Sequence, residues 1–238
     1  MKFDKRIFFK DLFERLKNNL VPKVDLHVHT NWTDGENSIS EMYQEAENKS
    51  LEAIFFSEHS RKESGKWFFD FCKEIDELPL KSCLPIVGTE VKVLNLDGDL
   101  DFNNEYKNVC DLIMASVHRF PGEKTNNIWK SKSNLNPEEI IKLEFNLMCA
   151  SLKNPLTDIL GHPFGMSIKR FGIDPPEELF DEIIMLCKKY NKIFEVNSRY
   201  HKSPKDLINK CINSNTLISI GSNAHSKNEL GNILEEIK

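Results

Sequence analysis

The sequence lacks several features that would assign the chain to particular protein classes. It contains no apolar run long enough to cross a bilayer and no Gly-, Ser- or Pro-rich tract that could serve as an interdomain linker. Its 32 Lys and Arg are outnumbered by 37 Asp and Glu, giving a net charge of −5. A membrane-spanning protein is therefore not indicated, and a broad nucleic-acid surface, which needs clustered basic residues, is disfavoured.

Cysteine pairs with metal-site spacing are also missing. The six cysteines are far apart and form no C-x-x-C pair. We interpret them as buried free thiols in a reducing compartment, which predicts a cytoplasmic protein.

The composition that is present suits one soluble domain. Of 238 residues, 29% are charged and 39% are hydrophobic, so we expect a single domain over residues 1–238. Residues 1–21 have scattered charges rather than the apolar core of a signal peptide. Their helical spacing of Ile7, Phe8, Leu12, Phe13 and Leu16 predicts an amphipathic helix packed on the domain, with a membrane-surface or partner helix as the alternative.

Short apolar runs alternate with helical patterns along the rest of the chain. Helices are predicted over 38–50, 62–82, 137–151, 175–190 and 203–213, several of which open with a capping box or an early proline. Strands are predicted over 24–30, 52–59, 84–94, 111–118, 158–162, 192–198 and 216–225. This α/β order predicts a parallel sheet closed into a (β/α) barrel, with an open doubly wound sheet as the alternative.

Histidines gather where these strands end. In the segment VDLHVHT, the side chains of Asp25, His27 and His29 share one face of the strand while Val24, Leu26 and Val28 share the other. Alone, such a pair is as compatible with a solvated strand face as with a metal site. However, His59, His118, His162 and His225 end later strands, where barrels build their active sites.

A metal cluster explains this accumulation. Unpaired imidazoles and carboxylates are costly to bury, and metal ions bind both together. The ligand types are nitrogen and oxygen, which suit Zn, Mn or Fe, and their number implies two or three divalent ions.

The ordered motifs resemble those of the PHP (polymerase and histidinol phosphatase) family. They are D-L-H-x-H-T with T-D-G (25–35), E-H (58–59), G-T-E (88–90), S-V-H (116–118), G-H-P (161–163) and G-S-N-A-H (221–225). The resemblance covers nearly the whole chain after residue 23. It implies a distorted (β/α)7 barrel of the TIM-like type with a metal cluster at the C-terminal ends of its strands.

The resemblance also implies the ligand groups. The first metal would be held by His27, His29, Glu90 and Asn223, the second by Glu90, His118 and His162, and the third by Asp34, His59 and His225. Asp25, Glu58 and Glu195 would lie behind these ligands and orient them. Asn223 departs from the family pattern, which has Asp there, so a metal at this position is expected to bind more weakly.

Similar segments favour the histidinol-phosphate phosphatase branch. SVHRFPG, IKRFG and the basic cluster after EVNS resemble that branch, which makes these cations candidates for binding the substrate phosphate: Arg119, Arg170, Arg199, His201 and Lys202. Ordinary solvated loop charges are the alternative.

The leading hypothesis is therefore metal-dependent hydrolysis of a small phosphomonoester, such as histidinol phosphate, by a metal-bridging hydroxide. The alternatives are a phosphodiesterase acting on nucleotides or nucleic-acid ends, and a degenerate module without activity. In the polar loop 126–136, Trp129 is either a lid over the site or a surface residue. The oligomeric state is not predicted.

Overall fold

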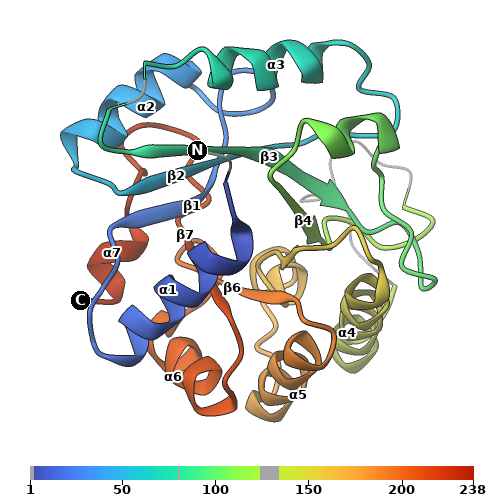
Figure 1. Cartoon of the computed structure of the whole chain (residues 1–238). Coiled ribbons are helices and arrows are strands. Elements are labelled where there is room, and N and C mark those ends of the chain that lie inside the picture. The colour runs from blue at the N-terminus through green and yellow to red at the C-terminus, as the bar shows by residue number, and fades with distance from the viewer. Residues whose placement is uncertain (1–2, 80, 124–133) are drawn as a thin grey trace.

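Seven parallel strands form the centre of the molecule in a computed structural model that describes residues 3–79, 81–123 and 134–238. They pair in sequence order, and Val28 forms an isolated parallel bridge with Ala224 that joins β1 to β7. The bounds are β1 Val24–Val28, β2 Ala53–Glu58, β3 Leu84–Lys92, β4 Leu112–Ser116, β5 Ile159–Leu160, β6 Ile193–Asn197 and β7 Ile218–Gly221. The predicted distorted (β/α)7 barrel is confirmed, and Figure 1 shows helices surrounding its strands.

Helices follow most of the strands. Their bounds are α1 Lys5–Lys17, α2 Ile39–Asn48, α3 Trp67–Asp76, α4 Pro137–Lys153, α5 Glu177–Lys189, α6 Pro204–Ser214 and α7 Ile233–Glu236. The capping box anticipated at the start of α2 is present, with Ser38 accepting from the Glu41 amide while Glu41 accepts from the Ser38 amide. The described residues also contain a 3-10 turn, η1 Asn104–Asn108, and a π-helical turn, η3 Met166–Arg170.

The strands are shorter than predicted at their carboxyl ends. Strand pairing stops before His162, whose φ is 25°, and before Asn223, whose φ is 51°. A positive φ is incompatible with continuing a strand. The backbone therefore turns at these residues and directs their side chains across the end of the barrel.

Helix α1 lies across the opposite end, formed by the amino ends of the strands. Lys5 pairs with Asp158 just before β5, and Arg15 makes two hydrogen bonds to Glu52 just before β2. The helix buries Phe9, Leu12, Phe13 and Leu16 against the domain, whereas Ile7 from the predicted apolar face is 68% exposed. Figure 1 shows α1 in front of the strands, so it covers the end of the barrel remote from the predicted ligands.

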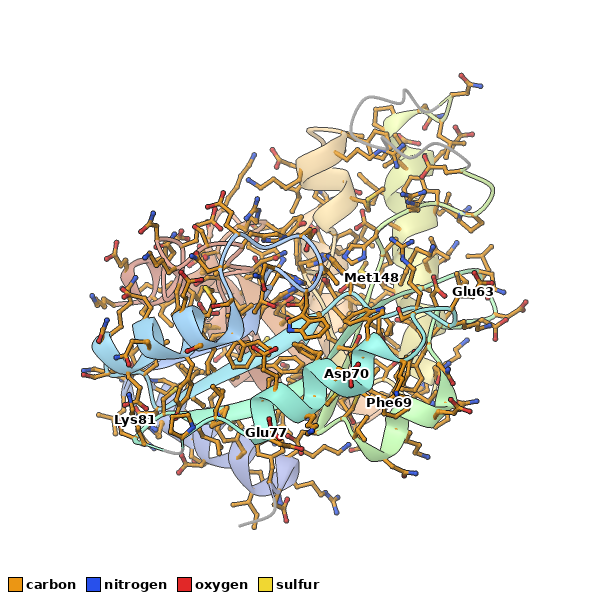
Figure 2. The ribbon with its side chains drawn as sticks, turned by 90° about the horizontal axis from the view of Figure 1, so that it is seen from above. Glu63, Phe69, Asp70, Glu77, Lys81 and Met148 are labelled. Carbon is orange, nitrogen blue, oxygen red and sulfur yellow. The ribbon has the colours of Figure 1, made fainter. Side chains whose placement is uncertain are left out.

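Helix α3 occupies the segment predicted to pack a helix on the core. Figure 2 looks onto this helix, with Phe69 and Asp70 labelled on it and Glu77 at its end. Its inner face buries Phe68, Phe71, Cys72 and Ile75.

Two further predictions concern membranes and the loop 126–136. Within residues 3–79, 81–123 and 134–238, no helix is long and apolar enough to cross a membrane. Trp129 and the greater part of the predicted loop lie outside the described residues.

Candidate metal centre

The predicted ligands converge at the carboxyl end of the barrel. Seven of them line a cavity of about 790 Å³: Asp34, His59, Glu90, His118, His162, Asn223 and His225. His27 and His29 are fully buried. They lie within 3.5 Å of the Glu90 carboxylate, so the structure brings all nine residues into one cluster.

Glu90, in β3, lies at the centre of this cluster and its two oxygens face different histidines. Oε1 lies 2.7 Å from His162 Nε2 and 3.0 Å from His118 Nε2. Oε2 lies 3.3 Å from His27 Nε2 and 3.5 Å from His29 Nε2. His59 Nδ1 also lies 3.3 Å from Oε2. A carboxylate that presents its two oxygens to separate sets of imidazoles would suit a ligand shared between two ions.

A further group forms around Asp34, which follows β1. Asp34 Oδ2 lies 3.4 Å from His59 Nε2 and 3.5 Å from His225 Nε2, and Oδ1 lies 3.9 Å from His29 Nδ1. His29 therefore faces Glu90 with one nitrogen and Asp34 with the other. The family resemblance placed His29 only with His27, Glu90 and Asn223. The position of its second nitrogen beside Asp34 is seen only in the structure.

The donor set fits divalent metal ions. Potential ligand atoms lie within 4.8 Å of one another in three groups: His29, Asp34, His59 and His225; His27, His29 and Glu90; and His59, Glu90 and His118. The Nε2 atoms of His27 and His29 are 3.1 Å apart, and those of His118 and His162 are 3.3 Å apart. Two nitrogens about 2.1 Å from a tetrahedral ion lie about 3.4 Å from each other, so these spacings suit shared ions.

Several buried polar atoms in this region have no hydrogen-bond partner among the described residues. They are Glu90 Oε2, His29 Nδ1 and Asn223 Oδ1. An unsatisfied buried polar atom costs about 1–3 kcal/mol, and native proteins rarely tolerate three together. Bound ions would satisfy all three atoms, because each is an oxygen or nitrogen with a lone pair.

The electrostatics favour the metal-binding protonation states of Glu90 and His29, whereas at His27 burial is outweighed by the carboxylates of Glu195 and Glu90, which raise its pKa to about 10. Burial opposes ionisation of Glu90, but the facing imidazoles of His118 and His27 lower its pKa well below the usual range. Burial, followed by the neighbouring His59, lowers the pKa of His29 well below its usual value. An ionised Glu90 beside a neutral His29 is the combination that coordinates a cation.

Glu195, in β6, orients two of the histidines. Its Oε1 accepts a hydrogen bond from His27 Nδ1 at 2.7 Å, and its Oε2 accepts one from the backbone N–H of His162. Asn197 Nδ2 donates to Glu195 Oε1 at 2.7 Å. With Nδ1 held by Glu195, the Nε2 atom of His27 faces Glu90 at 3.3 Å.

Glu58 and Asp25 hold the backbone segments that carry other ligands. Glu58 accepts hydrogen bonds from the amide and hydroxyl of Thr30 and from the hydroxyl of Thr33, in the loop that leads to Asp34. Asp25 accepts from the amides of Ser222 and Gly231 on either side of Asn223 and His225. Both carboxylates therefore hold the segments that carry the ligands, and Glu58 Oε2 also lies 4.0 Å from His29 Nδ1.

The backbone of residues 221–223 approaches the ligands closely and turns sharply beside them. A Cβ atom at Gly221 would lie 2.6 Å from His27 Cβ, which is closer than real Cβ contacts, so the strand approaches His27 only because the residue is glycine. Asn223 adopts a left-handed conformation (φ 51°) that Asn and Asp tolerate better than most residues. The Asn side chain thus preserves the local geometry and changes the charge.

The five predicted phosphate-binding residues separate into two sets. Arg119 and Arg199 line the cavity, and an Arg199 Nη1 atom lies 3.3 Å from His225 Nδ1. The other three are not among the residues that line it: Arg170, His201 and Lys202.

Each of these three side chains instead contacts another group of the protein. Arg170 makes two hydrogen bonds to Glu123, at 2.8 and 2.5 Å. His201 is buried between the Asn197 amide and the Pro163 carbonyl, and Lys202 pairs with Asp174. In the part of the chain that the structure describes, these three side chains are therefore engaged with other protein groups and do not line the cavity.

Other cavity residues were missed by sequence reasoning. Lys92 shares the inward face of β3 with Glu90, so strand alternation could have indicated it. Lys169 precedes Arg170 in η3, and nothing in the sequence indicated that this turn would be π-helical. Tyr200 stacks on His162 with ring centroids 4.2 Å apart and follows β6, where the histidine pattern gave no signal.

Comparisons with known proteins show which family and which fold this chain resembles. A model of the PHP domain matches residues 25–199. A probable phosphatase of Thermoanaerobacter sp. is 28% identical over 90% of this chain and 84% of its own length, and the DNA polymerase/3'-5' exonuclease PolX of Bacillus subtilis is 29% identical over 74% of this chain and 29% of its own length. Histidinol phosphate phosphatase from Lactococcus lactis, solved with zinc, L-histidinol and phosphate, superposes with a TM-score of 0.58 at 17% identity, covering 91% of this chain and 92% of that one.

Proposed function

Because this chain belongs to the PHP domain family, we propose that it is a metal-dependent hydrolase that releases phosphate from a small phosphomonoester. The observation that carries the proposal is the Glu90 carboxylate, with Oε1 beside His118 and His162 and Oε2 beside His27 and His29. Paired ions stabilise both the attacking and the leaving oxygen in phosphoryl transfer, so a bridging carboxylate suits this reaction.

The ligands of the ions would come from six strands and the segments that follow them. Glu90, His27, His29, His118 and His162 would hold two ions, with Asn223 Oδ1 as a neutral donor. Asp34, His59, His225 and His29 could hold a third. When bound, such ions provide Lewis acidity and a nucleophile at neutral pH.

The remaining side chains would bind and orient the ester. Arg119 and Arg199 line the cavity beside His118 and His225, where they can hydrogen-bond to phosphoryl oxygens. Glu195 keeps the Nδ1 proton on His27 and thereby fixes the orientation of its ring.

The relatives support a phosphatase more directly than a specific substrate. The Thermoanaerobacter protein is named a probable phosphatase, and the Lactococcus structure contains L-histidinol and phosphate. Histidinol phosphate therefore belongs in the test panel, together with sugar phosphates, phosphorylated acids and an activated diester.

The test compares metal-loaded, chelator-treated and Glu90→Gln protein. We expect the loaded protein to release inorganic phosphate from at least one monoester, and both treatments to reduce the rate by at least 100-fold. Metal content measured in parallel should fall in the Glu90→Gln protein. A loaded protein that is inert on every monoester contradicts the proposal, and turnover of the diester alone would favour the phosphodiesterase alternative.

A further inference from the structure

The cavity carries more positive charge than a single phosphate group requires. Five cationic side chains outside the ligand set line it, one from the end of each of five successive strands or the segment that follows: Arg61, Lys92, Arg119, Lys169 and Arg199. Apart from Asp34 and Glu90, the acidic residue lining it is Asp101. Outside the ligand set, the five cations and Asp101 sum to a formal charge of +4, and the carboxylates of Asp34 and Glu90 reduce the charge of the whole lining to +2, on a chain whose net charge is −5.

Asp101 is already engaged with the protein. Its Oδ1 accepts a hydrogen bond from the backbone N–H of Lys62 at 3.0 Å, and its Oδ2 lies 3.4 Å from Lys92 Nζ. These contacts tie the segment after β2 to the end of β3, so Arg61 and Lys92 belong to the same part of the rim. The carboxylate is therefore already paired with Lys92 and the Lys62 backbone and does not offer a site for a substrate amine.

The cations lie at two depths. Arg119 directly follows His118, and Arg199 lies 3.3 Å from His225, so both are beside the candidate metal ligands. Lys92 is two residues beyond Glu90 on the same face of β3, which places it about 7 Å nearer the cavity mouth. The deeper cations suit the reacting phosphoryl group, and the outer pair, Arg61 and Lys92, lies further along the cavity.

We propose that the substrate is a phosphomonoester with a second anionic group, a phosphate or a carboxylate, which binds at Arg61 and Lys92 while the first phosphate occupies the metal centre. This inference rests on the proposed function and narrows its substrate class. A cavity of about 790 Å³ accommodates a ligand larger than phosphate itself. The same charge repels esters whose alcohol carries an ammonium group, so this inference ranks amine-bearing phosphates, histidinol phosphate included, among the poorer substrates of the test panel.

The kinetic test uses three esters of one carbon skeleton with the metal-loaded protein. They are propane-1,3-diol monophosphate, propane-1,3-diol bisphosphate and 3-aminopropyl phosphate. We expect kcat/KM for the bisphosphate to exceed that for the monophosphate by at least 10-fold, after division by two for its two equivalent groups. The 3-aminopropyl ester should give the lowest value, and raising the salt from 0.05 to 0.5 M should reduce the bisphosphate preference.

Variants identify the residues responsible. Arg61→Gln and Lys92→Gln should each lower the bisphosphate-to-monophosphate ratio at least threefold. Lys107→Gln, which changes an exposed lysine of η1 outside the cavity lining, is the matched control and should leave the ratio unchanged. A ratio that is equally insensitive in all three variants would overturn the assignment to Arg61 and Lys92.

A binding measurement separates this inference from the proposed function. Calorimetry of the metal-loaded protein should show propane-1,3-diphosphonate, which cannot be hydrolysed, binding at least 10-fold more tightly than propylphosphonate. Tighter diphosphonate binding without turnover of any ester would support the second anion site and contradict the phosphatase. Turnover of the monophosphate, with no bisphosphate preference and equal phosphonate affinities, would overturn the second anion site alone.

Discussion

The ion pair between Arg170 and Glu123 raises the question of whether Arg170 binds substrate or stabilises the fold. The sequence resemblance makes Arg170 a phosphate ligand, whereas in the structure its side chain is 1% exposed and hydrogen-bonded to Glu123 through two nitrogens. Its guanidinium also lies 4.7 Å from the centre of the Phe171 ring. We therefore predict that Arg170→Met mainly destabilises the protein.

The expected magnitude follows from the burial of the pair. Removing one partner of a buried ion pair costs about 3–5 kcal/mol, and we take about 3 kcal/mol because Glu123 is 19% exposed. For a chain of this size, each kcal/mol shifts the melting temperature by about 2–4 °C, so the transition should fall by about 6–12 °C. Lys202→Met, which removes an exposed pair with Asp174, should cost less than about 1 kcal/mol.

The assays are thermal unfolding followed by circular dichroism and steady-state phosphate release well below the transition. The double variant Arg170→Met/Glu123→Leu should be less destabilised than the sum of the single variants, because neither buried charge is then left alone. We expect KM for the best monoester to change less than threefold in Arg170→Met. An unchanged melting temperature with a KM raised 10-fold or more would refute the structural role and restore Arg170 as a substrate ligand.

Three other substitutions test separate features of the molecule. Asn223→Asp should increase the number of ions retained after dialysis, because a charged oxygen replaces a neutral one, and equal metal content by mass spectrometry would contradict this. Glu144 accepts hydrogen bonds from the Ser167 hydroxyl and the Met166 amide, and burial raises its pKa to about 7. Between pH 4.5 and 7 the native protein therefore binds more protons than the unfolded chain, so its stability falls as the pH rises through that window. Glu144→Gln should remove this decline, so its unfolding free energy in urea should improve relative to the parent by about 3 kcal/mol from pH 4.5 to 8, and parallel profiles would exclude the mechanism. Phe9→Ala should lower the unfolding free energy by about 3–5 kcal/mol by opening a cavity under α1, and a loss below about 1 kcal/mol would mean that α1 contributes little to stability.

The barrel and the converging ligands were predictable because both follow from periodic features of the sequence. Strand alternation separates Val24, Leu26 and Val28 from the ionisable side chains of β1, and the parallel order brings all the strand ends to one face. The length of β5 was harder to predict, since only Ile159 and Leu160 pair with the neighbouring strands. The backbone turn at His162 ends that strand earlier than its apolar sequence suggests.

The orientation of the cations could not be predicted in the same way. Lys169 and Arg170 are adjacent in sequence, yet Lys169 lines the cavity and Arg170 pairs with Glu123. This difference depends on the π-helical turn η3, whose first residues are held by Glu144 from a different helix. A tertiary contact of that kind has no local pattern in the sequence.

The seam between β1 and β7 has a consequence for the order in which the chain folds. His29 N–H donates to the Ala224 carbonyl, and the Ala224 N–H donates to the His27 carbonyl, so the first and last strands meet directly beside the ligands. Contacts between segments so far apart in sequence carry a high entropic cost of loop closure, so we expect them to form late in folding. During synthesis, β1 to β6 leave the ribosome before His225 is available, so the Asp34 group acquires its last imidazole only when β7 has docked. Capture of an ion by that group would therefore report that the barrel has closed.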